Sequence, residues 1–393
     1  MPGPPHILVF VTFCWLASSI MPSVASARTI YIDKRVGSKE WTGATAEPGD
    51  GDGPVKYPKR AVNQLAKPGD VIFFMPESGP YKLPLECNKS GEPGNPITIE
   101  GNGVTFDLLT DLSNCRWSRR EDGSWLLKTS LNLKGSPKQK PFKRYQPRED
   151  RVAAFYKGMP IYYHTDRGKP AGPFTAVLLE DKTSIVFYFP QDIKPPFAGL
   201  FLVFRSAASG VRFRGASHWI IRNVHVRGAG NDGFNYHHDE KGDKADTATA
   251  KDIVVENCSA MFNGDEGTSA HEDYEVTVKD SVFAFNASPS GGVNDMMQTQ
   301  TTYINCISAF NRGVGFQLRS GEHAVVDCLT AGNSRTEDAT DLPPSTRIRN
   351  LVRIPPGPGL LEKIKAWNPE HPQLSRLLKT VEELKAQGTD LDL

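Results

Sequence analysis

Short apolar runs rich in β-branched residues recur between residues 219 and 333, each interrupted by Asn or Asp. Five of these segments read IIRNVHVRGAG, VVENCSAMFNG, VTVKDSVFAFN, YINCISAFNRG and VVDCLTAGN. They align on an Asn or Asp anchor, with spacings of 34, 23, 25 and 22 residues between Asn223, Asn257, Asp280, Asn305 and Asp327. A period near 23 without a 3.6-residue helical pattern predicts a parallel β-solenoid, whose coils bury their inner faces only by stacking.

Equivalent positions of such a repeat form columns, because stacked strands lie about 4.8 Å apart. The column six positions after the anchors contains Asn263, Asn286, Asn311 and Asn333. We expect these residues to form a side-chain ladder at a turn, since Asn tolerates left-handed backbone and bonds locally. The column one position after the anchors contains Cys258, Cys306 and Cys328, which we expect to pack inward as small apolar groups.

The NCSAMFN and NCISAFN segments resemble the right-handed parallel β-helix repeat of the pectate-lyase-like superfamily. The stretches TIYIDKRVGSKEW, GDGPVKYPKRAVNQLAKPGDVIFFMP and SGEPGNPITIEGNG are similar to the N-terminal module of secreted β-helix proteins of the chondroitinase B and alginate lyase type. The resemblance covers residues 29–110 and 200–335. It implies an all-β, right-handed parallel β-helix in which PKRAVNQLA is a short helix capping the solenoid. It does not define the reaction, because one fold supports many functions.

We expect five regions along the 393 residues: a signal peptide (1–27), an N-terminal cap with the first coils (28–110), an inserted β subdomain (111–205), the β-helix repeats (206–340), and a Pro-rich linker with a C-terminal helix (341–393). The inserted region departs from the repeat, and WSRREDGSW in it predicts a hairpin with Asp122-Gly123 in the turn. The C-terminal helix has Leu374, Leu377, Leu378, Val381 and Leu384 on one face. We expect this face to pack on the body, over the open C-terminal end of the solenoid.

The N-terminus has the features of an export signal. Residues 7–21 are almost wholly apolar, and Ala25-Ser26-Ala27 offers a cleavage site of the A-x-A type. We therefore expect a secreted or periplasmic protein without a transmembrane segment, because the apolar run is short for a membrane span. Cleavage would leave Cys87, Cys115, Cys258, Cys306 and Cys328, an odd number that argues against a disulfide framework.

The charge balance narrows the possible partners. With 46 Lys+Arg against 45 Asp+Glu, the formal charge of +1 gives no bulk attraction to nucleic acid, and we expect no such partner. We also expect a monomer. Residues 134–150 are basic and aromatic. They are either a solvated loop or a contact surface for an anionic polymer.

Two histidine clusters, NDGFNYHHDE from residue 231 and DEGTSAHED from residue 265, follow the first two repeats. A gapless extension of the alignment places His237, His271, Asn294 and Arg319 in one column, and His238, Glu272 and Asp295 in the next. Strand alternation points Phe234 and Tyr236 inward, and Asn235, His237 and Gln317 outward. We predict a groove with catalytic His237, His271 and Arg319, and with substrate-binding Asn235, His238, Glu272, Asn294, Asp295 and Gln317.

This composition suits elimination on an anionic polysaccharide that contains uronic acid. Such a reaction needs a group that neutralises the carboxylate, a base that removes the C5 proton, and an acid that protonates the leaving oxygen. Arg319 would neutralise, because it is always charged and binds carboxylates bidentately. His271 or His237 would be the base, with the other histidine or a tyrosine as the acid. The sequence thus predicts a polysaccharide lyase or a C5-epimerase, which would use much the same groups.

Other interpretations stay open at this point. Hydrolysis needs two carboxylates, and Asp232, Glu266, Glu272 and Asp295 are the candidates. A non-catalytic solenoid that binds glycans or surfaces is another alternative. A transition metal on His237, His271 and Glu272 would lack a spacing signature. Ca²⁺ could bind in a loop containing Asp239, Glu240, Asp243 and Asp246, but this loop has no defined ligand pattern such as that of the EF-hand, which favours a solvated loop.

Overall fold

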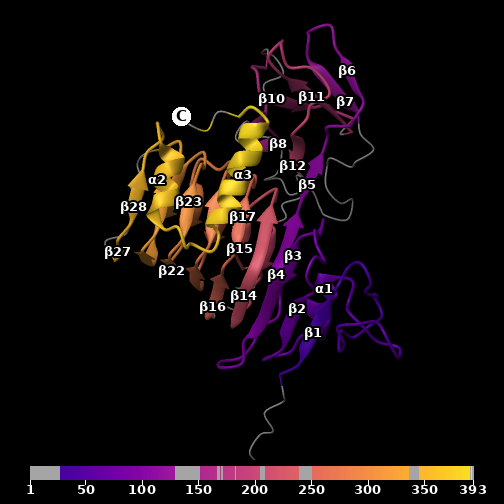
Figure 1. Cartoon of the computed structure of the whole chain (residues 1–393), viewed down its shortest axis with the longest axis vertical. Coiled ribbons are helices and arrows are strands. Elements are labelled where there is room, and N and C mark those ends of the chain that lie inside the picture. Colours follow the sequence, from indigo (N-terminus) through magenta and orange to yellow (C-terminus); the bar gives the residue numbers. More distant parts are fainter. Residues whose placement is uncertain are drawn as a thin grey trace, which may run out of the picture.

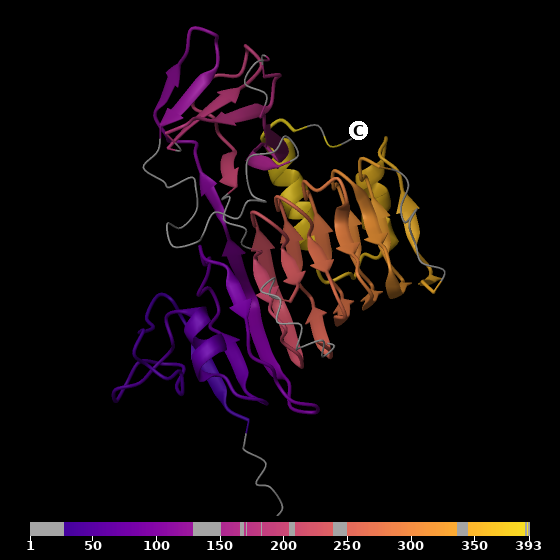
Figure 2. The same cartoon turned by 180° about the vertical axis from the view of Figure 1, so that it is seen from behind.

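The computed structural model describes residues 27–128, 151–165, 169, 171–181, 183–203, 209–238, 250–335, 345–389 and 391. Its strands stack into a right-handed parallel β-helix, with a separate, mainly antiparallel sheet at one end and two helices along one side (Figures 1 and 2). The all-β solenoid that the repeat predicts is therefore confirmed. The predicted signal peptide and the basic stretch 134–150 lie outside the described residues, apart from Ala27.

Three parallel sheets run along the solenoid. Sheet 1 consists of β3 (Leu85–Cys87), β13 (Val211–Phe213), β15 (Phe234–Tyr236), β18 (Thr268–Ala270), β21 (Gly291–Asp295) and β24 (Val314–Leu318). Sheet 2 consists of β1 (Thr29–Ile32), β2 (Val71–Phe74), β16 (Ile253–Glu256), β19 (Glu275–Lys279), β22 (Thr299–Ile304), β25 (Gly321–Val326) and β27 (Arg347–Arg349). Sheet 3 consists of β17 (Ser259–Met261), β20 (Val282–Ala284), β23 (Ile307–Ala309), β26 (Leu329–Ala331) and β28 (Val352–Ile354). The long strands β4 (Ile97–Asp107) and β14 (Trp219–Arg227) turn the corner and join sheets 2 and 3.

The anchor residues of the repeat make the corner between sheets 2 and 3. All five anchors have left-handed backbone, with φ between 48° and 56°. Asn and Asp adopt this conformation more readily than other residues with a side chain, so their recurrence explains why every coil bends at the same place. The anchor side chains also bond to one another, as Asn305 Nδ2 does by donating to Asp280 Oδ1 at 2.6 Å.

The solenoid interior is apolar and continuous along the axis. Cys258, Cys306 and Cys328 are 0% exposed and free, so the predicted inward packing of this column is what the structure has. Burial raises the pKa of the Cys258 thiol to about 12. These thiols are therefore inert packing groups rather than nucleophiles.

A second set of columns lies at the turn after sheet 3. Asn263, Asn286, Asn311 and Asn333 form a continuous ladder in which each side-chain amide of the first three donates to the next Oδ1 at 2.8 to 3.0 Å. Phe262, Phe285 and Phe310 stack beside it, with ring centroids 5.2 and 5.1 Å apart. These phenylalanines also have left-handed backbone, which is costly for a bulky residue and is compensated here by the stack and the ladder.

The N-terminal end of the solenoid is capped by a short helical turn. This turn consists of α1 (Pro58–Arg60) and the π-helical η1 (Ala61–Leu65), and it buries Ala61 and Val62 fully against the first coil. The family resemblance implies such a helical cap. It covers the first coil, which would otherwise expose its apolar interior to solvent.

The chain leaves the solenoid after β4 and builds a mainly antiparallel sheet, in which only β9 and β10 pair in parallel among the described strands, before it returns. This inserted sheet has the strand order β5-β12-β8-β9-β10-β11-β7-β6. The strands are β5 (Leu109–Asp111), β6 (Trp117–Arg119), β7 (Trp125–Lys128), β8 (Val152–Tyr156), β9 (Met159–Tyr163), β10 (Thr175–Leu178), β11 (Ser184–Tyr188) and β12 (Leu200–Val203). It contacts the solenoid at the turns between sheets 3 and 1, where the Arg151 guanidinium pairs with Asp265 at 2.6 Å.

The C-terminal helices are α2 (Leu360–Trp367) and α3 (Leu374–Ala386). They lie across the outer face of sheet 3 (Figure 1), so the prediction that α3 covers the open C-terminal end is wrong. The reason is that sheet 3 has apolar residues on its outer face as well, such as Val282 and Ile307, and these need a cover. No helix in the described ranges is long and apolar enough to cross a membrane.

Candidate functional site

The outer face of sheet 1 carries the residues that the sequence singles out, but its register differs from the gapless alignment. Thr268 pairs with Val293, not with Gly291. The turn from Asn286 to Val293 is two residues longer than the turn from Asn263 to Thr268, and the alignment had no gap to absorb the difference. The positions of β21 are therefore displaced by two residues, an even number that preserves the inward and outward alternation. The next strand, β24, is back in the counted register, because Val293 pairs with Phe316.

The two leading histidines are neighbours on adjacent coils. The His237 and His271 rings stack with centroids 5.1 Å apart and an interplanar angle of 28°. Glu272 lies beside them, with its Oε1 3.4 Å from His237 Nδ1 and its Oε2 accepting from the His238 backbone N–H at 3.1 Å. The His238 ring instead leans toward Tyr274, at 5.0 Å between centroids.

Hydrogen bonds define the proton positions on both rings. His237 Nδ1 lies 2.6 Å from the His238 carbonyl oxygen, which only accepts, so Nδ1 carries the proton and Nε2 is the basic atom. His271 Nε2 lies 2.8 Å from Ser269 Oγ, whose own proton goes to the Asn294 carbonyl. Burial, the His237 charge and the Arg212 charge lower the pKa of His271 to about 4. His271 is therefore neutral near pH 7.

Three predicted substrate-binding residues form a different column. Asn294 pairs with Gln317 along the sheet, in the column of Asn235 and Ser269, and not beside His271 as predicted. Asn235 and Asn294 are only 3% and 5% exposed. The Asn235 amide donates to Asp232 Oδ2 at 2.6 Å, and the Asn294 amide donates to Glu266 Oε1 at 3.0 Å. Both asparagines hold acidic side chains in place.

The prediction that Asp295 binds substrate is wrong. Asp295 is 0% exposed, and its Oδ2 accepts from the Thr301 and Tyr303 hydroxyls at 2.7 and 2.8 Å. The two-residue displacement puts it in the inward column with Tyr236 and Ala270. Burial raises the pKa of this carboxyl, which is satisfied inside the solenoid and does not reach a groove.

Arg319 is in the histidine column two coils beyond His271, as the alignment predicts, but Met296 and not Asn294 occupies this column on the coil between them. Arg319 donates its backbone N–H to the Asp295 carbonyl, whereas Met296 donates to the Ala270 carbonyl one coil earlier. Arg319 is thus in the histidine column, but the coil of Met296 separates it from His271. The exposed Arg319 side chain stands two coils away from the histidine pair.

Arg212 is the cationic residue next to the histidines, and it was missed. It lies on β13 and pairs with Asn235 on the neighbouring strand β15, its charge acts on His271, and its buried Nε has no hydrogen-bond partner. Arg214 precedes His237 in the same column, because Phe213 pairs with Tyr236. The stretch GVRFRG shows the same alternation as GFNYHH, but it lies before the first recognised repeat at Trp219.

An acidic cluster lies at the start of these strands. The cluster consists of Asp232, Asp265 and Glu266. Each contributes one carboxylate oxygen, and these three oxygens lie within 4.8 Å of one another. Burial and the Asp265 charge raise the pKa of Asp232 to about 7, and they raise the pKa of Glu266 well above its usual value. Ser288 and Asn294 donate to Glu266 Oε1 at 2.7 and 3.0 Å. A hydrogen-bonded path through Asn294 and Ser269 links this cluster to His271.

The sequence suggested two further metal sites, one on the histidine pair and one in an acidic loop. Among the described residues, the acidic cluster is the only group of three ligand-bearing side chains close enough to share an ion, so His237, His271 and Glu272 do not form one. The loop proposed for Ca²⁺, with Asp239, Glu240, Asp243 and Asp246, lies outside the described residues.

Comparison with known proteins supports the fold. Residues 209–336 match the family model described as right handed beta helix region, which is about a third of the chain. This region is a right-handed β-helix. No curated protein matches the chain. The family match covers the histidine pair and all of sheet 1 except β3, but not the N-terminal cap or the inserted sheet.

Solved structures that are similar at low identity include three carbohydrate-related proteins. Pectate lyase Pel9A is 14% identical, with 81% of this chain and 58% of that chain covered and a TM-score of 0.44. XylC in complex with xylose is 12% identical, with 82% and 69% covered and a TM-score of 0.47. A rhamnogalacturonan lyase is 14% identical, with 83% and 87% covered and a TM-score of 0.34. The chain thus spans 58% of the length of Pel9A, and these likenesses carry no functional argument.

Proposed function

We propose that this protein is an exported carbohydrate-active enzyme that acts on uronate-containing polysaccharide by β-elimination or C5-epimerisation. The observation that carries the proposal is the outer face of sheet 1, where Arg212 and the stacked pair His237 and His271 occupy neighbouring coils. Export, which residues 1–27 predict, would place the enzyme where such polymers occur. The anionic polymer is the expected partner.

Arg212 takes the neutralising role that the sequence had assigned to Arg319. A guanidinium bound to the uronate carboxylate stabilises the negative charge that develops when C5 loses its proton. The half-buried Arg212 has a buried Nε without a hydrogen-bond partner, which supports this role. Arg212 pairs with Asn235 and is therefore diagonal to His237, a separation of roughly 7 to 8 Å that a sugar ring can bridge.

His237 is the better base of the two histidines. Its Nδ1–H is held by the His238 carbonyl and lies close to Glu272, which leaves Nε2 to accept a proton and stabilises the ring once charged. Neutral His271 adds no positive charge to the stack and therefore does not oppose this protonation. Return of the proton to the opposite face of C5 would give the epimer, so product analysis separates the two reactions.

The acidic cluster fits a bound Ca²⁺. Its donors are all oxygens, and the buried Oδ1 of Asn294 has no hydrogen-bond partner although the same amide contacts Glu266. Asp232, Asp265 and Glu266 would hold the ion. When bound, the ion would supply a positive charge that attracts substrate carboxylates.

Hydrolysis is the second candidate, because the raised pKa values of Asp232 and Glu266 are those of a general acid at neutral pH. Their exposures of 2% and 5% oppose it, since a general acid must touch the glycosidic oxygen. A non-catalytic solenoid would use the same face for binding alone.

The test is incubation with a panel of anionic polysaccharides, with near-UV absorbance and reducing ends followed together, and with C5 deuterium incorporation from D2O measured by NMR. Absorbance with new ends supports elimination, and deuterium without cleavage supports epimerisation. New ends alone would indicate hydrolysis, and a silent panel would refute catalysis on these polymers. We expect R212Q and H237N to lose at least about 100-fold in kcat/KM. The matched control R319Q, two coils away, should stay within about threefold of the wild type.

A further inference from the structure

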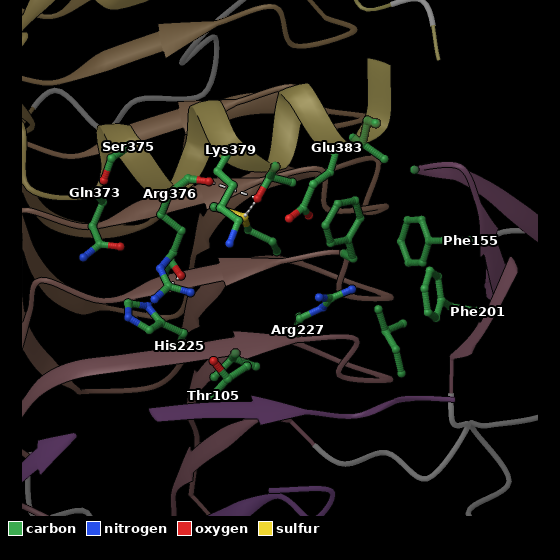
Figure 3. Close-up of a pocket in the computed structure, with 18 of the residues that line it drawn as sticks. Thr105, Phe155, Phe201, His225, Arg227, Gln373, Ser375, Arg376, Lys379 and Glu383 are labelled. Atoms are coloured by element: carbon green, nitrogen blue, oxygen red, sulfur yellow. Dashed lines mark hydrogen bonds between the residues drawn. The ribbon is translucent and has the colours of Figure 1, made fainter. Parts of the chain in front are cut away.

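A cavity lies away from sheet 1, between α3, the outer face of sheet 3 and the inserted sheet. It has a volume of about 630 Å³, within the roughly 300 to 1,000 Å³ of small-molecule sites. Strand β14 contributes His225 and Arg227, helix α3 contributes Arg376 and Lys379, and the inserted sheet contributes Phe155 and Phe201. Figure 3 shows Arg376 extending from α3 toward His225, with the two phenylalanines at the opposite end.

The cationic end of this cavity has few counter-charges, because Glu383 is the one carboxylate among the described lining residues, against Arg227, Arg376 and Lys379. In the described part of the chain, no carboxylate lies within 4.0 Å of the charged groups of Arg376 or Lys379. Burial and the nearby Arg227 lower the pKa of Arg376. Arg227 Nε is itself buried without a hydrogen-bond partner, and its nearest carboxylate, Asp107 at 3.7 Å, is shared with Lys82. Desolvated cations near one another are costly unless an anion joins them.

The other walls of the cavity indicate which groups the ligand carries besides an anionic one. The partly exposed Phe201 and the largely buried Phe155 line this end, and the Arg227 guanidinium lies 5.8 Å from the centroids of Phe201 and Phe262. The apolar face of a pyranose ring packs on such surfaces. His225 Nδ1 lies 2.9 Å from Ser259 Oγ, and burial with the nearby Arg376 lowers its pKa to about 3. A neutral His225 and Ser259 suit sugar hydroxyls rather than a second anionic group.

We propose that this cavity binds a small carboxylated sugar of one or two residues, with its carboxylate between Arg227 and Arg376 and its ring against Phe155 and Phe201. The site is distinct from the sheet 1 face and does not depend on catalysis there. Because its walls come from three parts of the chain, an occupied cavity ties α3 and the inserted sheet to the solenoid.

The binding test uses isothermal titration calorimetry and thermal unfolding of the full chain with D-galacturonate and D-glucuronate. Galactose, glucose, acetate and inorganic phosphate are the comparison ligands. We expect saturable binding of at least one uronate and a rise in Tm, with each comparison ligand at least tenfold weaker. R376Q should weaken uronate binding at least tenfold, whereas the exposed R353Q on β28 should change it less than twofold. H237N should bind as the wild type does, which separates this site from the proposed active site.

Three results would overturn the proposal: no uronate binds, phosphate binds more tightly than any uronate, or R376Q binds as well as R353Q. The ligand-free protein supplies a further check. R376Q removes a half-buried cation that has no carboxylate partner, so its Tm should equal or exceed that of the wild type. A lower Tm for R376Q without ligand would make Arg376 a structural residue and would overturn its role as an anion ligand.

Discussion

The most informative perturbation of this protein is Asp232→Asn in the acidic cluster, measured without divalent ions. Asp232 is 2% exposed, and burial with the Asp265 charge raises its pKa from 3.8 to about 7. The unfolded chain thus ionises this carboxyl more readily than the folded chain does. Stability from this group is fully present below about pH 4 and is lost as the pH rises toward 7. Three pKa units correspond to about 4 kcal/mol.

The substitution also has a local cost. Asp232 accepts hydrogen bonds from the Asn231 and Asn235 amides and from the Glu266 backbone N–H. An Asn side chain keeps one acceptor oxygen and turns an NH2 group toward donors, which costs about 1 to 3 kcal/mol. We therefore expect D232N to be less stable than the wild type by about 1 to 3 kcal/mol at pH 4. Above pH 8 it should be more stable by a similar amount.

The assay is urea unfolding in a chelator at pH 4, 6 and 8.5, with the free energy of unfolding compared at each pH. The matched control D273N changes an exposed carboxylate in the turn between β18 and β19. Its free energy of unfolding should differ from that of the wild type by less than about 0.5 kcal/mol at every pH. A D232N curve that runs parallel to the wild-type curve would refute the argument. It would mean that the buried carboxyl is not held protonated by its surroundings.

The remaining predictions concern metal, packing and titration. Added Ca²⁺ at pH 8 should raise the Tm of the wild type but not that of D232N, and an equal rise in both would refute the ion site. F285A should cost about 3 to 5 kcal/mol in urea unfolding. F285G should be no less stable than F285A, because φ is +58° at this position, and a clearly less stable F285G would contradict the backbone argument. Burial lowers the pKa of His225 to about 3, so the unfolded chain takes up a proton between pH 7 and 5 that the folded chain does not. The free energy of unfolding of the wild type should therefore fall by about 2 kcal/mol over this range, and H225Q should remove that fall. A thiol reagent should leave Cys258 unmodified in the native protein, and fast labelling without unfolding would contradict its burial.

The histidine pair shows how far the repeat could predict the site. His237 and His271 follow turns of equal length, so counting from the anchors placed them on adjacent coils. The next turn, from Asn286 to Val293, is two residues longer, and a gapless count then misplaced Asn294 and Asp295, whereas Arg319 kept its column. A turn can lengthen without changing the alternation of the strand that follows, so the sequence carried no sign of the displacement.

The sequence by itself determined the solenoid, its corners and its inward columns, because these depend on local preferences repeated at every coil. Left-handed Asn and Asp, small buried thiols and alternating strands each act within one coil and its neighbour. Only the tertiary structure decided which cation adjoins the histidines and where α3 lies. These depend on stacking register and on surfaces such as the outer apolar face of sheet 3, which brings Arg376 on α3 to Arg227 on β14. Contacts between residues so far apart in the chain leave no period in the sequence.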